Sequence, residues 1–289
     1  TEPEVAAVGN GAGLRLASFQ DAASSPSLRG TSNNLNAVAP NVCFRCHGDR
    51  PARVERRVTR SITQDNKRLQ FQTDNPSFHP VAAAGRNHLI LKTDLRQVGE
   101  VGAMVRTAVD RFGRLDILVN NIERGGWPVV HGAYTREQWD LEIETSLRAK
   151  RWVFAATLPH LKAAGDGAVI NLSSIAGVVG RAGPAAPVFN DGYAAANRAV
   201  SLLTETWARE AAPEVRVNEI MLGFVDTRHG PGTRGWGLLS EAQKKAIDDH
   251  TLLGRTGRIE DVVKAVMFIL RDAPFMTGSV LRLDGGYVL

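Results

Sequence analysis

The feature that most constrains the fold is a change of pattern near residues 86–88. After this point, short apolar runs alternate with amphipathic stretches. The apolar run 88–93 is followed by apolar residues at helical spacing over 98–112 and then by the apolar run 115–119. An apolar run bounded by polar residues is typical of a buried strand, and the 3.6-residue spacing is typical of a helix. The order strand, helix, strand is the simplest interpretation.

The same alternation continues to residue 283. It predicts helices over 136–164, 193–210, 241–250 and 260–270, and strands over 168–172, 215–221 and 279–283. Strands separated by helices indicate parallel strands joined by crossovers, so we expect an α/β fold with a doubly wound, Rossmann-like parallel sheet over 88–289. Residues 1–87 are rich in Ser, Asn, Pro and Arg, and we expect a loop-rich N-terminal extension there.

Polar residues follow the predicted strands at their carboxyl ends, where ligands bind to sheets of this kind. They are Asp94, Asn120 and Asn121, Ser174, and the segment that holds Gly223, Val225 and Thr227. With the Tyr-Ala-Ala-Ala-Asn stretch at 193–197 and the Thr-Gly-Ser-Val-Leu-Arg-Leu-Asp-Gly-Gly stretch at 277–286, they occur in an order that resembles the short-chain dehydrogenase/reductase family. The resemblance covers about residues 89–289.

The resemblance implies an oxidoreductase that moves hydride between NAD or NADP and a small alcohol or carbonyl compound. Tyr193 would be the general acid/base, and Ser174 would hold the substrate oxygen. Asp94, Asn120, Asn121, Gly223, Val225 and Thr227 would contact the cofactor. Family members commonly form homo-oligomers, here through the helices near 136 and 193, and are cytoplasmic. A loop over 227–236 and Trp127 are candidates for the substrate side.

Two of the departures from the family pattern concern the expected catalytic residues. The family lysine four residues after the tyrosine lowers the tyrosine pKa and grips the cofactor ribose, but this chain has Asn197 there. The family's water-relay asparagine on the preceding helix corresponds to Ser146. An amide can bind a ribose hydroxyl but carries no charge. These departures favour impaired activity, or a non-catalytic binding or structural protein with the same fold.

The expected phosphate-binding loop is the least regular part of the resemblance. Gly9, Gly11 and Gly13 can be placed on a cofactor glycine loop, but Arg15 stands where the last glycine would allow close packing. No acidic residue follows about 20 positions later to hold a ribose. A turn in an N-terminal segment is the alternative interpretation of these glycines.

A second redox motif lies in the extension. Cys43-Phe-Arg-Cys46-His47 has the spacing that attaches a c-type haem through two thioethers, with His47 as an iron ligand. The surrounding sequence resembles multihaem cytochromes, which implies His79 as the second iron ligand. The alternatives are a coincidental pair of cysteines, a redox dithiol, or half of a zinc site. Haem c would imply an electron-transfer protein with a redox partner, in the periplasm or outside the cell.

The composition bounds the remaining classes. The formal net charge is +5, but Arg and Lys crowd the stretch 50–68, and such a run is usually a solvated face rather than a nucleic-acid site. No window resembles a membrane helix. The sequence therefore predicts an enzyme for a small molecule that binds neither nucleic acid nor a membrane, with electron transfer as the alternative.

Overall fold

The chain forms a five-stranded parallel sheet. The computed structural model describes residues 16–18, 89, 91, 93–122, 135–226 and 239–289. The sheet order is β1-β2-β3-β4-β7, and each neighbouring pair is parallel. The strands are β1 (Leu16–Ser18), β2 (Ile117–Asn120), β3 (Gly167–Ser174), β4 (Val215–Leu222) and β7 (Val280–Leu283). A further parallel pair joins β5 (Val225–Asp226) to β6 (Gly257–Arg258).

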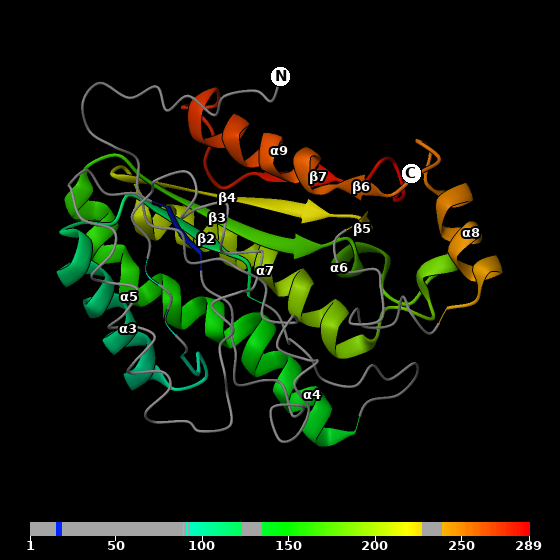
Figure 1. Ribbon diagram of the computed structural model, residues 1–289, viewed down its shortest axis with the longest axis horizontal. Coiled ribbons are helices and arrows are strands. Elements are labelled where there is room, and N and C mark those ends of the chain that lie inside the picture. The colour runs from blue at the N-terminus through cyan, green and yellow to red at the C-terminus, as the bar shows by residue number, and fades with distance from the viewer. Residues whose placement is uncertain (1–15, 19–88, 90, 92, 123–134, 227–238) are drawn as a thin grey trace.

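Helices cover both faces of this sheet, as predicted (Figure 1). The helices of the described residues are α3 (Val98–Phe112), α4 (Arg136–Glu142), α5 (Ala149–Ala164), the short α6 (Ala176–Val179), α7 (Asp191–Ala211), α8 (Glu241–His250) and α9 (Ile259–Arg271). A 3-10 turn, η4 (Gly183–Ala185), lies between α6 and α7. The helix predicted over 136–164 is one run in which the π-helical segment η3 (Ile143–Arg148) separates α4 from α5. In the described residues, no helix is both long and apolar enough to cross a bilayer.

Local sequence explains where several helices begin and end. Thr135 and Ser240 each accept a hydrogen bond from the backbone three residues on, and form complete capping boxes at the starts of α4 and α8. Gly113 and Gly165 end α3 and α5 with φ angles of 82° and 84°, in the left-handed region that glycine adopts at low cost.

Alternation along the strands divides the core into two layers. Leu118, Val169 and Val217 lie in the apolar cluster that contains the buried faces of α3, α5 and α7. Ile170, directly after Val169, and Ile220, three positions after Val217, belong to the cluster that contains Ala265 and Ile269 of α9. Successive side chains of a strand point to opposite faces, so a sheet covered on both sides needs apolar residues at nearly every position. This explains the continuous apolar runs in the sequence.

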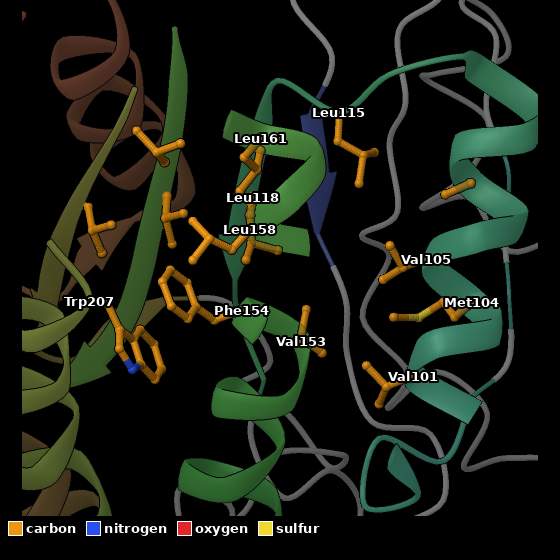
Figure 2. Close-up of a cluster of buried hydrophobic side chains, with 14 of the residues drawn as sticks. Val101, Met104, Val105, Leu115, Leu118, Val153, Phe154, Leu158, Leu161 and Trp207 are labelled. Atoms are coloured by element: carbon orange, nitrogen blue, oxygen red, sulfur yellow. The ribbon is translucent and has the colours of Figure 1, made fainter. Parts of the chain in front are cut away.

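The larger layer is held together by aromatic packing between helices (Figure 2). Phe154 of α5 and Trp207 of α7 are almost completely buried, and their rings stack at 4.5 Å with an interplanar angle of 7°. Such a pair adds about 0.5–1.5 kcal/mol to the stabilisation from burial alone. The contact fixes α7 against α5, and α7 carries Tyr193.

Two features differ from the sequence prediction. The predicted strand over 88–93 is wrong for the residues described there, since Leu89, Leu91 and Thr93 lie in no strand. Leu89 is buried in the core cluster and Leu91 packs against it, so their apolar character serves packing rather than strand pairing. The sheet also uses β1, from the predicted loop-rich extension, which pairs with β2.

Candidate functional site

Ser174 is the last residue of β3, at the carboxyl edge of the sheet. It is 7 % exposed, and its Oγ accepts a hydrogen bond of 3.1 Å from the backbone N–H of Ala176. This bond holds the hydroxyl oxygen at the start of α6. Because the oxygen accepts there, its proton remains available to donate to a ligand.

Tyr193 lies in the first turn of α7. The helix is capped by Asn190, whose Oδ1 accepts the Tyr193 backbone N–H at 2.9 Å. The Tyr193 ring packs against the apolar cluster that contains Ile175 and Ala176, the two residues directly after Ser174. The cluster therefore brings the carboxyl end of β3 and the first turn of α7 together at one edge of the sheet.

Close backbone packing fixes this arrangement. A Cβ atom on Gly177 would lie 2.7 Å from the backbone N of Arg198 and 2.9 Å from the carbonyl carbon of Asn197. Only glycine allows α6 to approach α7 so closely, because these contacts are with helix backbone and cannot rotate away. The position of Ser174 relative to Tyr193 therefore depends on Gly177 having no side chain.

Asn197 and Ser146 are both buried, and each bonds to a residue of its own helical run. The Nδ2 of Asn197 donates to the backbone carbonyl of Tyr193 at 2.9 Å. Ser146 lies in the π-helical segment η3, which packs against α7, and its Oγ donates to Oε1 of the buried Glu142. π-Helical turns occur often at functional sites. In this structure the turn carries the residue predicted from the family pattern.

Asp94 lies outside this cluster of side chains and is bound by a neighbour. Both carboxylate oxygens of Asp94 accept from the Arg96 guanidinium, at 2.9 and 2.7 Å. Burial raises the pKa of Asp94, but the Arg96 hydrogen bonds and charge outweigh this effect and hold the pKa below its usual value. The carboxylate is therefore charged and already occupied.

The predicted cofactor residues after β2 and β4 divide into two groups. Asn120 is fully buried, and its Nδ2 donates to Oδ1 of Asn171 at 3.1 Å, so its side chain lies beneath the helices rather than at the open edge. Asn121 and Gly223 are half-buried at the edge. Val225 is buried and pairs with β6.

A row of aromatic rings extends from Tyr193 to the C-terminal residues. The ring centroids of Tyr193 and Phe189 are 6.1 Å apart, and Phe189 stacks on Phe224 at 5.5 Å with an interplanar angle of 8°. Tyr287 packs edge-on against Phe224 at 5.4 Å and against His250 at 4.7 Å. Phe189 and Tyr287 belong to the apolar cluster against which the rings of Tyr193 and Phe224 pack.

Several predicted residues lie outside the described part of the chain: Gly9, Gly11, Gly13, Cys43, Cys46, His47, His79, Trp127 and Thr227. In the described part, no three His, Cys, Asp or Glu side chains come close enough together to hold a metal ion. The strand β1 follows the three glycines in the chain, whereas a cofactor glycine loop follows its strand.

The sequence prediction missed a buried polar group beneath this edge. Lys150 of α5 is 2 % exposed, and its Nζ donates to the carbonyl of Ile122 at 2.5 Å. Glu219 of β4 is fully buried, and its Oε1 accepts from Ser173 and, at 3.0 Å, from Ser201. Lys150 and Glu219 each interrupt an apolar pattern, in α5 and in β4. Because Lys and Glu are rarely buried without partners, these interruptions could have indicated a buried polar group.

Comparison with known proteins identifies relatives over most of the chain. The family model described as enoyl-(acyl carrier protein) reductase matches residues 69–288. The chain is 31% identical over 245 residues to a 1,6-dihydroxycyclohexa-2,4-diene-1-carboxylate dehydrogenase of Pseudomonas putida, covering 81% of this chain and 88% of the relative. It is 33% identical over 201 residues to a 3-oxoacyl-(acyl-carrier-protein) reductase of Thermotoga maritima, covering 68% and 74%.

Solved structures show the same architecture. A short-chain dehydrogenase/reductase from Burkholderia xenovorans superposes with a TM-score of 0.60 at 25% identity, covering 72% of this chain and 78% of that protein.

Proposed function

The chain belongs to the short-chain dehydrogenase/reductase family, and we propose that it transfers hydride between NAD or NADP and a small alcohol or carbonyl compound. The observation that supports this proposal is the close packing at Gly177 of α6, which follows Ser174, against α7, which carries Tyr193. Two hydroxyl groups held on rigid elements suit the activation of a carbonyl oxygen.

The described residues fit the reacting half of a nicotinamide nucleotide. The half-buried Asn121 and the hydroxyls of Ser174 and Tyr193 offer uncharged polar groups, which suit a carboxamide and a ribose. When bound, the nicotinamide supplies or accepts the hydride. Gly9, Gly11 and Gly13 stay predictions for the pyrophosphate.

Each residue has a separate task in this proposal. Ser174 donates its hydroxyl proton in a hydrogen bond to the substrate oxygen, and Tyr193 exchanges a proton with the same oxygen. Asn197 maintains the first turns of α7 by its bond to the Tyr193 carbonyl. Because Asn197 carries no charge, the tyrosine lacks the cation that the family places at this position.

We propose a cyclic alcohol or ketone as the substrate class, with a 3-oxoacyl thioester as the alternative. One relative is named as a dehydrogenase of a dihydroxycyclohexadiene carboxylate, and another as a 3-oxoacyl-(acyl-carrier-protein) reductase. A panel of cyclohexanol, cyclohexanone and acyl thioester substrates compares the two classes directly.

The experiment is a fluorescence titration of the full-length protein with NADH and NADPH, followed by turnover assays on Tyr193→Phe. We expect saturable nucleotide binding by the wild-type protein and, in Tyr193→Phe, a loss of turnover of about 10²- to 10⁴-fold, the usual contribution of a general acid. Tyr287→Phe is the matched control, because it removes a hydroxyl from the same aromatic row. Full turnover in Tyr193→Phe would exclude the proposed role.

The haem hypothesis for Cys43, Cys46, His47 and His79 stays a separate prediction with its own test. A covalent haem adds its mass to the intact protein and gives an intense absorption band near 400 nm, which a redox partner protein would change on reduction. A colourless protein with the mass of the sequence would exclude it. This measurement is independent of the nucleotide titration.

A further inference from the structure

We propose that Lys150 is a positioning residue for the cofactor side of this site. Its buried ammonium group holds the carboxyl end of β2, beside a row of buried polar side chains that ends at Glu219. The inference rests on the proposed function, because it assigns a role to the edge that would receive the nicotinamide nucleotide.

The Lys150 side chain reaches from the helix layer to the end of a strand. Its Nζ donates to the backbone carbonyl of Ile122 at 2.5 Å and lies 3.4 Å from that of Asn120. Among the residues that the structure describes as buried, Lys150 is the one lysine or arginine. A buried ammonium group is costly unless its N–H groups are bonded, so these carbonyl contacts fix both the side chain and the backbone.

A polar row crosses the sheet beside this ammonium group. Asn120, Asn171 and Glu219 are neighbours in register on β2, β3 and β4, and each is fully buried. The Asn120 amide donates to Asn171 at 3.1 Å, and the Asn171 amide donates to Thr204 of α7 at 2.9 Å. The row gives this layer of the core a defined hydrogen-bond pattern that an apolar core would not have.

Glu219 ends the row on the side away from β2. Burial raises the pKa of the Glu219 carboxyl, while the hydroxyls of Ser173 and Ser201 and the charge of Lys150 act in the opposite direction. Replacing Lys150 by a neutral residue therefore removes one of the influences that favour the charged form of the buried Glu219 carboxyl.

The location of the held carbonyls connects this group to the cofactor. Lys150 of α5 contacts the carbonyls of Asn120 and Ile122 from the helix-covered side of the sheet. Asn121, between them in the chain, is half-buried. Ligands of parallel sheets bind outside the carboxyl ends of the strands. Lys150 therefore fixes the backbone that presents Asn121, without touching the ligand itself.

The test uses the full-length protein with Lys150→Met, Glu219→Gln and the double variant. Hydrogen exchange over residues 116–122 without nucleotide reports the order of the β2 end, NADH and NADPH titrations report affinity, and urea unfolding reports stability. We expect faster exchange and an affinity about tenfold weaker, or about 1.4 kcal/mol, in Lys150→Met. The double variant regains much of the lost stability, because a neutral pair replaces a charged one, but keeps the weak affinity and fast exchange.

Three outcomes separate the possible explanations. Wild-type exchange and affinity in the double variant would overturn the inference, because the pair would then serve stability alone. If Lys150→Met does not fold, the double variant decides the same question. If the wild-type protein binds neither nucleotide, the proposed function fails, and the exchange of residues 116–122 still decides whether Lys150 orders the β2 end.

Discussion

Replacing Gly177 by alanine tests whether the contact between α6 and α7 positions the site. The added Cβ would lie 2.7 to 3.0 Å from three backbone atoms of Asn197 and Arg198, whereas ordinary contacts lie at 3.4–4 Å. Gly99 of α3 is the matched control, because it is also helical and an added Cβ there meets nothing within 4 Å. Both variants gain helix propensity, about 0.5–1 kcal/mol. The difference between them isolates the overpacking, about 1–3 kcal/mol.

The assay combines urea unfolding with steady-state kinetics. We expect Gly99→Ala to be as stable as wild type or more stable, and fully active. Gly177→Ala should unfold at lower urea with an unchanged slope, and its kcat/KM should fall by at least tenfold, because displacing α7 by a fraction of an ångström misplaces Tyr193 relative to Ser174. Equal stability and equal activity of the two variants would refute this account of how the site is held.

Two further predictions concern charge. Asn197→Lys places a cation about one helical turn, roughly 6 Å, from Tyr193. At an effective dielectric constant of about 20, this cation stabilises a negative charge on Tyr193 by about 3 kcal/mol. The pH at which kcat reaches half its maximum should therefore be about one to two units lower, whereas Asn197→Met should show no such shift. Since the folded-state pKa of Glu219 is raised above its ordinary value of 4.5, folding binds a proton and stability falls as pH rises from about 4.5 through the folded pKa. Urea unfolding at several pH values should therefore show Glu219→Gln gaining stability relative to wild type over that window, and a constant difference would count against the burial of a titrating carboxyl.

Periodicity was sufficient to predict most of the described elements. The alternation of apolar strands and amphipathic helices places α3, α7, α8, α9 and the strands β2, β3, β4 and β7 close to their observed bounds. Both core layers use apolar residues at regular spacing, so the pattern reports them directly. The candidate site residues Ser174 and Tyr193 came from the resemblance to the family and stay predictions, and the structure places them at the end of β3 and in the first turn of α7.

Tertiary contacts could not be predicted in the same way. The role of Gly177 depends on the backbone of Asn197, twenty residues later, and the environment of Lys150 depends on the end of a strand that precedes it. The run 88–93 has a strand-like composition, but the described residues there pack into the core outside any strand. In each case the structure depends on contacts between segments that are distant in sequence, and local sequence patterns do not predict such contacts.

Because a row of packed rings connects Tyr193 to Tyr287, a change near Tyr193 on ligand binding can be detected at Tyr287. Tyr287 is 2 % exposed and Leu289 is 80 % exposed, so the packed row ends only two residues before a freely accessible position. The sequence contains three tyrosines, so a fluorotyrosine-labelled protein gives a fluorine spectrum with few signals. A ligand that moves the Tyr193 ring should shift the Tyr287 signal through Phe189 and Phe224. A bulky tag fused directly behind Leu289 should broaden the same signal.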